Sequence, residues 1–303
     1  MGYVLVLIAS VCYAGEFALV KYYQKSTEQK LLVVFFMLLI RYAVGAVLAL
    51  CCSGFSLDFS NISPWMTIVM SGVFVLYNVL GVAILSRGNL AIYSMFMMVG
   101  GMLLPMLHGV LFMKESLSVF QIVGTVLLVA FMALQTLQFK KKDGEATDKK
   151  DAKSLIVFTL LCLLAFIDNG SLGIIRTHEL EVNQAHEYTF AFSYCLLTAA
   201  IGGCGVVGYM IKDKQGSAAL LKPCVKPLSL LTLVGIGCIA NIGDILLLVS
   251  TGKVPESVMY PIVSGATIVF SAIAALLVFK EKMKTREIVA VIGAALATVL
   301  FIF

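Results

Sequence analysis

The sequence predicts an all-α membrane protein with ten transmembrane helices in two inverted five-helix repeats. Of the 303 residues, 60% are hydrophobic and 13% are charged, whereas soluble domains are about half apolar and about a quarter charged. Apolar runs of about twenty residues recur along the chain, and as helices they would cross a bilayer core of about 30 Å. The third observation is an internal repeat.

The repeat relates the stretches Asn89–Met132 and Val254–Phe303, each an apolar run, a charged turn and a second apolar run. A shift of 166 positions places Lys114-Glu115 on Lys280-Glu281. Repeats of this kind indicate two related halves. We interpret both charged turns as caps of helical hairpins and not as binding groups.

Ten spans follow from the hydropathy pattern. They are 2–22, 31–52, 64–85, 90–113, 117–138, 154–174, 188–211, 228–249, 254–279 and 285–303. Each must be helical, because lipid offers no partner for unpaired backbone groups. Residues 1–142 form the first repeat, 143–153 a Lys-rich linker, and 154–303 the second repeat. Five spans is an odd number, so the second repeat enters the membrane inverted relative to the first.

Basic residues predict the orientation of the chain. Eighteen lysines and arginines lie in loops after odd-numbered spans, and three, Arg176 among them, lie in loops after even-numbered spans. Because basic loops stay in the cytoplasm, we expect the Lys140–Lys153 segment to be cytoplasmic and both termini to lie outside. The expected location is the bacterial plasma (inner) membrane. The net charge of +5 reflects this orientation and does not indicate nucleic-acid binding.

Several short motifs recur in the two repeats. They are Lys114-Glu115-Ser116-Leu117, Gln121 and Gly124, then Lys280-Glu281, Glu287 and Gly293, and the segments Gly15–Lys21 and Gly170–Arg176. With these motifs the chain resembles the drug/metabolite transporter superfamily, in particular its EamA-like branch. Two positions depart from that pattern, since Met95 stands at the place matching Pro261, and Ala14 precedes Gly15 instead of tryptophan. The resemblance implies a ten-span carrier that alternates between two faces and holds its substrate between the halves.

Ionisable residues inside the spans are the first candidates for function, because a charge at mid-membrane costs at least about 2.5 kcal/mol. Glu16 could bind a cationic group or a proton, or pair with Lys21. Arg41 suits a substrate carboxylate or phosphate, which a guanidinium grips with two hydrogen bonds. Alternatively, Arg41 pairs with Glu16 or Asp168. His108 could relay protons, or it could be an ordinary hydrogen-bonded histidine.

Asp244 is the strongest single candidate. Under the 166-residue shift it falls on Asn78, and polar residues at one depth in both inverted halves are what a central site requires. Asp168 is a further candidate for substrate binding or coupling.

Aromatic residues and prolines complete the candidate site. Tyr93 and Tyr260 could line it and hold an apolar or cationic solute, with core packing as the alternative. Pro105 and Pro261 interrupt their spans, and we predict that they act as hinges.

These features favour a secondary transporter of a small organic solute, such as a metabolite, an amino acid, an amine or a drug. Transport would be coupled to a proton or sodium gradient, or would be uncoupled facilitation or exchange. A non-transporting membrane scaffold is the alternative of a different class. We do not predict an enzyme, since the sequence has no H-E-x-x-H, G-x-S-x-G or phosphate-binding G-x-x-x-x-G-K-[ST] motif. No cofactor or metal is expected, and the expected partners are substrate, coupling ion and lipid, with the chain as a monomer or homodimer.

Overall fold

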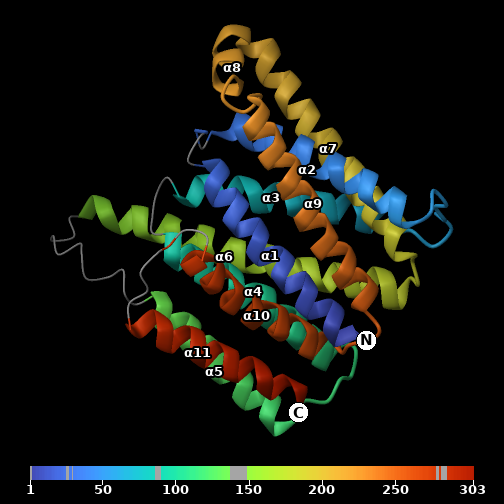
Figure 1. Ribbon diagram of the computed structural model, residues 1–303, viewed down its shortest axis with the longest axis vertical. Helices are drawn as coiled ribbons and strands as arrows, with labels where there is room; N and C mark the ends of the chain where they lie inside the picture. Colours follow the sequence, from blue (N-terminus) through green and yellow to red (C-terminus); the bar gives the residue numbers. More distant parts are fainter. Residues whose placement is uncertain are drawn as a thin grey trace. The chain divides into compact units, whose positions relative to one another are not determined.

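The computed structural model of the protein describes residues 2–24, 27–28, 30–85, 90–136, 149–277, 280 and 285–303. Within these ranges, the side chains at 82, 85, 90–94, 135–136, 149–155 and 286–287 are not described. The described chain is helical, as predicted from the apolar runs (Figure 1).

Eleven α-helices follow one another in the described part of the chain. They are α1 (Gly2–Gln24), α2 (Leu31–Cys52), α3 (Pro64–Leu85), α4 (Leu90–Leu111), α5 (Val119–Thr136), α6 (Lys149–Thr177), α7 (Glu187–Lys212), α8 (Lys214–Leu221), α9 (Pro227–Ser250), α10 (Glu256–Leu277) and α11 (Thr285–Val299). A π-helical turn, His178–Val182, follows α6, and a short 3-10 turn, Leu300–Ile302, ends the chain. Each predicted span overlaps one of these helices, and α8 is an addition.

Seven of the described helices are long and apolar enough to cross a membrane: α1, α2, α3, α6, α7, α9 and α10. Three further apolar helices, at 95–111, 119–134 and 288–302, are shorter within the residues searched. The large hydrophobic side chains that these helices expose are the surface that lipid would cover. The structure therefore agrees with a membrane protein.

The chain folds as two compact units, each built from two separate segments. Unit 1 comprises Met1–Val79 and Ile175–Lys253, and unit 2 comprises Leu80–Ile174 and Val254–Phe303. Two of the three boundaries fall inside helices, α3 and α6, and the third lies between α9 and α10. Each unit thus contains residues of both predicted repeats, so the compact units and the sequence repeats divide the chain differently.

In unit 2, α10 packs against α4 and α11, and α11 packs against α5. The bounds of these helices follow the repeat: α4 and α10 begin at 90 and 256 and end at 111 and 277, a shift of 166 at both ends. Lys114 (φ 58°) and Lys280 (φ 51°), which are also 166 residues apart, both adopt the left-handed conformation. Left-handed backbone is uncommon for a residue with a side chain, so the match between these two residues supports a relation between the two stretches.

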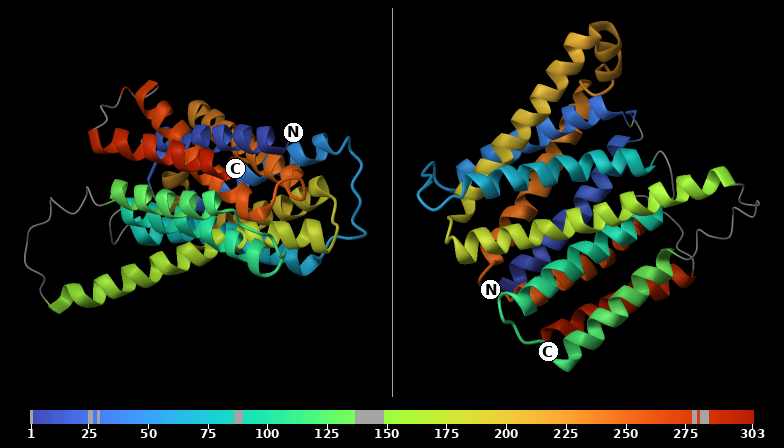
Figure 2. Two further views of the ribbon diagram at one scale, coloured as in Figure 1. Left: turned by 90° about the horizontal axis from the view of Figure 1, so that it is seen from below. Right: turned by 180° about the vertical axis from the view of Figure 1, so that it is seen from behind.

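In unit 1, α1 packs along α9, and α2 packs against both α7 and α9 (Figure 2, where α1 is dark blue and α9 orange). Small residues permit the closest approach. A Cβ atom on Gly202 of α7 would lie 2.7 Å from the backbone nitrogen of Leu39 on α2. Packing of this kind drives helix association in lipid, where the hydrophobic effect gives no preference for protein neighbours.

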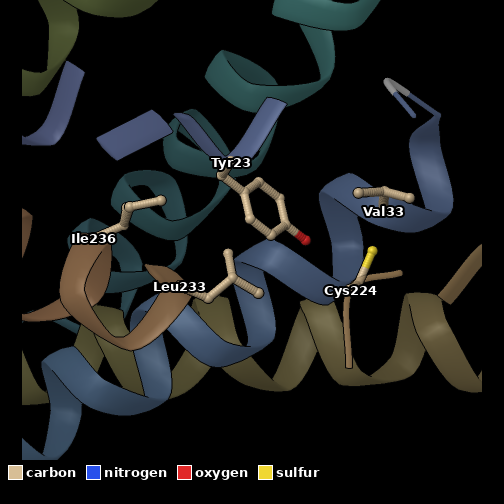
Figure 3. Packing of buried hydrophobic residues seen from close by; sticks show 5 residues of the cluster. All are labelled: Tyr23, Val33, Cys224, Leu233 and Ile236. Atoms are coloured by element: carbon tan, nitrogen blue, oxygen red, sulfur yellow. The ribbon is translucent and has the colours of Figure 1, made fainter. Parts of the chain in front are cut away.

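One end of unit 1 is filled by an apolar cluster, which we call the Tyr23 plug (Figure 3). It consists of Tyr23, Val33, Cys224, Leu233 and Ile236, all buried. Tyr23 follows Glu16 on α1 by seven residues, which is about 10 Å along a helix axis. Val33 precedes Arg41 on α2 by eight residues, so the plug lies to one side of the charged residues of these helices.

Candidate functional site

Glu16 and Arg41 form a buried ion pair in unit 1. Glu16 lies on α1 and Arg41 on α2, and their Oε1 and Nη1 atoms are 2.6 Å apart. Both side chains are buried. Of the partners considered for these two residues, the structure brings together Glu16 and Arg41.

Asp244 forms the second buried pair, with a residue that the sequence did not single out. Its Oδ1 atom accepts hydrogen bonds from Arg176 Nη2 and from Tyr13 Oη, the latter at 2.8 Å. The assignment of Arg176 to a loop was wrong, because α6 continues through Thr177 and buries this arginine. The Gly170–Arg176 spacing, which repeats that of Gly15–Lys21, was the signal in the sequence that this residue belongs to the span.

The two pairs form one electrostatic group, which we call the charged cluster: Glu16, Arg41, Arg176 and Asp244. Asp244 interacts electrostatically with both Glu16 and Arg41. One pair comes from each predicted repeat. The two carboxylates and the two guanidiniums carry opposite charges, so the net charge of the four side chains is zero. A buried charge is tolerated when it is paired and hydrogen-bonded, and both pairs meet that requirement.

Aromatic rings adjoin the charged cluster in unit 1. The rings of Tyr42 and Phe74 have centroids 5.1 Å apart, and those of Phe74 and Tyr194 are 5.3 Å apart. The Arg41 guanidinium carbon lies 5.3 Å from the Tyr42 ring centroid, and that of Arg176 lies 6.0 Å from the Phe74 centroid. Cations within about 6 Å of a ring face are attracted to it, so the rings stabilise both arginines.

Several buried polar atoms of this region have no hydrogen-bond partner among the described residues. They include Arg41 Nε, Tyr42 Oη, Tyr194 Oη and Asp244 Oδ2. Such atoms are costly to bury and call for an explanation, of which a missing ligand or water is one. Together they provide a donor, two hydroxyls and an acceptor.

Asn241 ties the helices around the charged cluster together. Its Nδ2 donates to the backbone oxygens of Arg41, at 3.0 Å, and of Gly237, at 2.7 Å. Cys195 Sγ on α7 donates to its Oδ1 at 3.3 Å. Gly45 is needed here, since a Cβ atom at that position would lie 2.8 Å from Asn241 Nδ2. Asn241 is therefore a positioning residue that fixes α2 against α9.

The other predicted lining residues lie elsewhere or are not described. Asn78 is half-buried, and its Nδ2 donates to the backbone oxygen of Phe74 on its own helix at 2.8 Å. The side chain of Tyr93 lies outside the described residues. Tyr260 is buried in unit 2, where its ring, like Pro105, lies against Gly173.

Unit 2 holds a second polar group, centred on His108. Its Nδ1 lies 2.8 Å from Oε2 of Glu256, the first residue of α10, and Glu256 is buried. The proposed hinges Pro105 and Pro261 lie inside α4 and α10 respectively.

Asp168 has a buried carboxyl group that accepts no hydrogen bond from a described residue. It belongs to the unit 2 part of α6 and is 4% exposed, and neither carboxyl oxygen has a hydrogen-bond partner among the described residues. The amide of its neighbour Asn169 is committed to the backbone oxygen of Met97, at 2.7 Å. Burying a carboxylate without a partner is costly, and the neutral acid avoids that cost.

Glu115 of the predicted cap motif does cap a helix, and the helix is α10. Its Oε1 accepts from the backbone N–H of Glu256 at 2.7 Å, and its Oε2 accepts from Ser257 at 2.8 Å. The first N–H groups of a helix have no partner within the helix, and a carboxylate also opposes the positive end of the helix dipole. The equivalent Glu281 lies outside the described residues.

We expect Glu115→Ala to lower the stability of the protein by about 1–2 kcal/mol, the upper range for loss of a helix cap. Thermal unfolding of the purified protein in detergent measures this. The control is Glu28→Ala, whose carboxylate pairs with Lys30 on the surface, where an ion pair contributes little. Equal losses of stability in the two variants would show that the Glu115 cap stabilises the protein no more than a surface ion pair does.

Comparison with known proteins gives a likeness of fold. No family model matches the sequence, and no curated protein matches it. A solved structure titled "Crystal structure of protein" is similar, with a TM-score of 0.70 and 13% sequence identity. The match covers 99% of this chain and 94% of the other. At that identity the likeness shows that the two chains share a fold.

Proposed function

We propose that the protein is a secondary transporter that moves a small organic solute across a membrane by alternating access, with the charged cluster as its substrate site. The supporting observation is the group of buried polar atoms without hydrogen-bond partners, Arg41 Nε and Asp244 Oδ2 among them, beside two buried ion pairs. Ionisable residues at membrane depth are expensive and are mostly retained for function.

The resemblance to the EamA-like branch of the drug/metabolite transporters supports the same proposal. So do the matching bounds of α4 and α10, which are 166 residues apart at both ends. We extend the proposal to ten spans in two inverted repeats. Inverted repeats give a carrier two related conformations, each open to one side.

Coupling to a proton gradient has two candidate groups in unit 2. Asp168 lacks a hydrogen-bond partner among the described residues, and His108 adjoins a buried carboxylate. Each could carry a proton across part of the cycle. Uncoupled facilitation or exchange remains the second candidate, because paired charges alone can bind solute.

Flux into proteoliposomes tests the proposal. A panel of amino acids, amines, nucleosides and sugar phosphates is offered with and without a pH gradient and a sodium gradient. We expect saturable, protein-dependent uptake of at least one solute, and faster uptake when the gradient is present. Uptake that ignores both gradients would favour the facilitator, and no uptake of any solute would contradict the proposal.

The orientation of the chain gives a separate prediction. Cysteine tags in the Lys140–Lys153 linker should resist membrane-impermeant thiol reagents in intact cells, because basic loops stay in the cytoplasm. Residues 140–148 of this linker lie outside the described residues. The tags are placed in a background with Cys51→Ser and Cys52→Ser, since both thiols are exposed at the end of α2.

The native cysteines serve as the opposite control. The loop after α2 is predicted to lie outside, so the unmodified chain should react at Cys51 and Cys52 with the same reagent. Ready labelling of the linker, or protection of these two thiols, would contradict the predicted orientation and favour the opposite one.

A further inference from the structure

The connection between α7 and α9 in unit 1 carries four exposed lysines. Lys212 is the last residue of α7, Lys214 is the first of α8, Lys222 follows α8 and Lys226 precedes α9. Among the described residues, no acidic side chain forms an ion pair with any of the four. Their ammonium groups are therefore available to a partner outside the chain.

The one acidic residue in this connection is already used within the chain. The Oδ1 atom of Asp213 accepts a hydrogen bond from the backbone N–H of Gly216 at 2.9 Å and so caps α8. Four lysines and one aspartate give residues 212–226 a net charge of +3. Exposed basic residues next to a membrane are attracted to anionic lipid headgroups.

The short helix α8, which joins the end of α7 to the start of α9, presents two of the lysines on its outer face (Figure 1). Its inner face is fixed, since Ser217 Oγ donates to the backbone oxygen of Tyr209 at 3.0 Å. Lys214 and Lys222 are eight residues apart, which is about 12 Å along a helix axis. Ala218 lies midway between them and is small and exposed, so a headgroup has room between the two ammonium groups.

Apolar side chains adjoin the lysines on both neighbouring helices. Ile211, next to Lys212, is 82% exposed, and Leu228, two residues after Lys226, is 61% exposed. They lie at the ends of α7 and α9, which are long and apolar enough to cross a membrane. A lysine at the end of such a helix lays its apolar stem along the surface and keeps its charge at headgroup level. The connection therefore offers positive charge for a headgroup and apolar surface for acyl chains.

We propose that this connection binds an anionic phospholipid, with the phosphate between Lys214 and Lys222 and the acyl chains against the exposed apolar side chains of α7 and α9. The loop belongs to the basic set predicted to be cytoplasmic, and the cytoplasmic leaflet carries the negative surface charge. A zwitterionic headgroup brings no net charge to offset the +3. The site is separate from the charged cluster and requires only that unit 1 lies in a membrane.

Native mass spectrometry of the purified full-length protein in neutral detergent tests the proposal by counting bound lipids. Dioleoylphosphatidylglycerol is compared with dioleoylphosphatidylcholine, because the two share their acyl chains and differ in headgroup charge. Each basic residue near an anionic surface contributes about fivefold, so we expect about 30-fold tighter binding of phosphatidylglycerol from Lys214 and Lys222 together. The preference should decrease at high salt, which screens exposed charges.

Substitutions on α8 assign the effect to these side chains. Lys214→Gln and Lys222→Gln should each weaken phosphatidylglycerol binding about fivefold and leave phosphatidylcholine binding unchanged. Replacing both lysines with arginine should keep the preference, because the charge remains. Lys30→Gln is the matched control. It removes one exposed charge on the same predicted side of the membrane, but Lys30 is already paired with Glu28, at 2.7 Å.

Several outcomes would overturn the proposal. Phosphatidylglycerol that binds no more tightly than phosphatidylcholine is one, and an equal loss in Lys30→Gln and Lys214→Gln is another. Displacement of the lipid by glycerol phosphate or by polyglutamate would identify a soluble phosphate ester or an acidic protein as the occupant instead. Size-exclusion chromatography checks that each variant is folded, and if one is not, the other variants and the wild-type comparison of the two lipids decide.

Discussion

Asp244→Asn is expected to reduce solute flux by about 10- to 100-fold while the chain stays folded. The substitution keeps the shape of the side chain but removes the charge that Arg176 faces. Loss of a hydrogen bond between the Asp244 carboxylate and the solute would cost about 1.5–3 kcal/mol of binding, and each 1.4 kcal/mol corresponds to about tenfold in an equilibrium constant. The Arg176 charge that is left unpaired should lower Tm as well. Flux into proteoliposomes, with protein amount and Tm measured beside it, gives the result.

A double variant separates function from structure at this position. Asp244→Asn combined with Arg176→Gln removes both charges, so no buried charge is left alone. If the pair serves only the fold, the double variant should regain both stability and flux. We expect it to regain stability without flux. Asp213→Asn is the matched control, because Asp213 is an exposed helix cap, and asparagine caps as well as aspartate. Unchanged flux in Asp244→Asn would remove Asp244 from the proposed site.

Gly202→Ala is expected to destabilise the protein by about 1–3 kcal/mol or more, as overpacking does. The added Cβ atom would lie 2.7 Å from Leu39 N and 2.9 Å from Phe35 O, both backbone atoms of α2. Backbone cannot rotate away as a side chain can, so α2 and α7 would have to move apart. Because α2 carries Arg41 and α7 carries Cys195, which bonds Asn241, we also expect slower flux.

Gly208→Ala on the same helix is the control for Gly202→Ala. A Cβ atom there meets nothing within 4 Å, and alanine has the higher helix propensity by up to about 1 kcal/mol. Thermal unfolding in detergent should therefore show a large loss for Gly202→Ala and little change or a small gain for Gly208→Ala. Similar changes of Tm at both positions would mean that the close contact between α2 and α7 at Gly202 does not govern the result.

The helices could be predicted from the sequence because each is an uninterrupted apolar run. The bounds of α2 and α3 coincide with the predicted spans. The end of α6 was placed too early, since Arg176 and the following His178–Val182 turn look polar in isolation. The compact units could not be predicted, because they depend on contacts between segments far apart in the chain.

Part of the candidate site could also be predicted from the apolar runs. Charges within apolar runs stand out, so Glu16, Arg41 and Asp244 were found. Which charge pairs with which depends on the rotation of each helix, and the alternatives stayed open until the geometry was known. Tyr42 escaped notice, because an aromatic residue in an apolar run resembles core packing until its hydroxyl is found buried without a partner.

In the proposed carrier, the Tyr23 plug would matter for release of the solute. Its side chains are buried and mostly apolar, and attraction between charges is stronger in surroundings of low dielectric constant and falls steeply when water enters. A conformation in which Tyr23 separated from Val33 and Leu233 would admit water to that end of unit 1. Contacts between the charged cluster and a polar group of the solute would then weaken, so opening the plug would itself favour release.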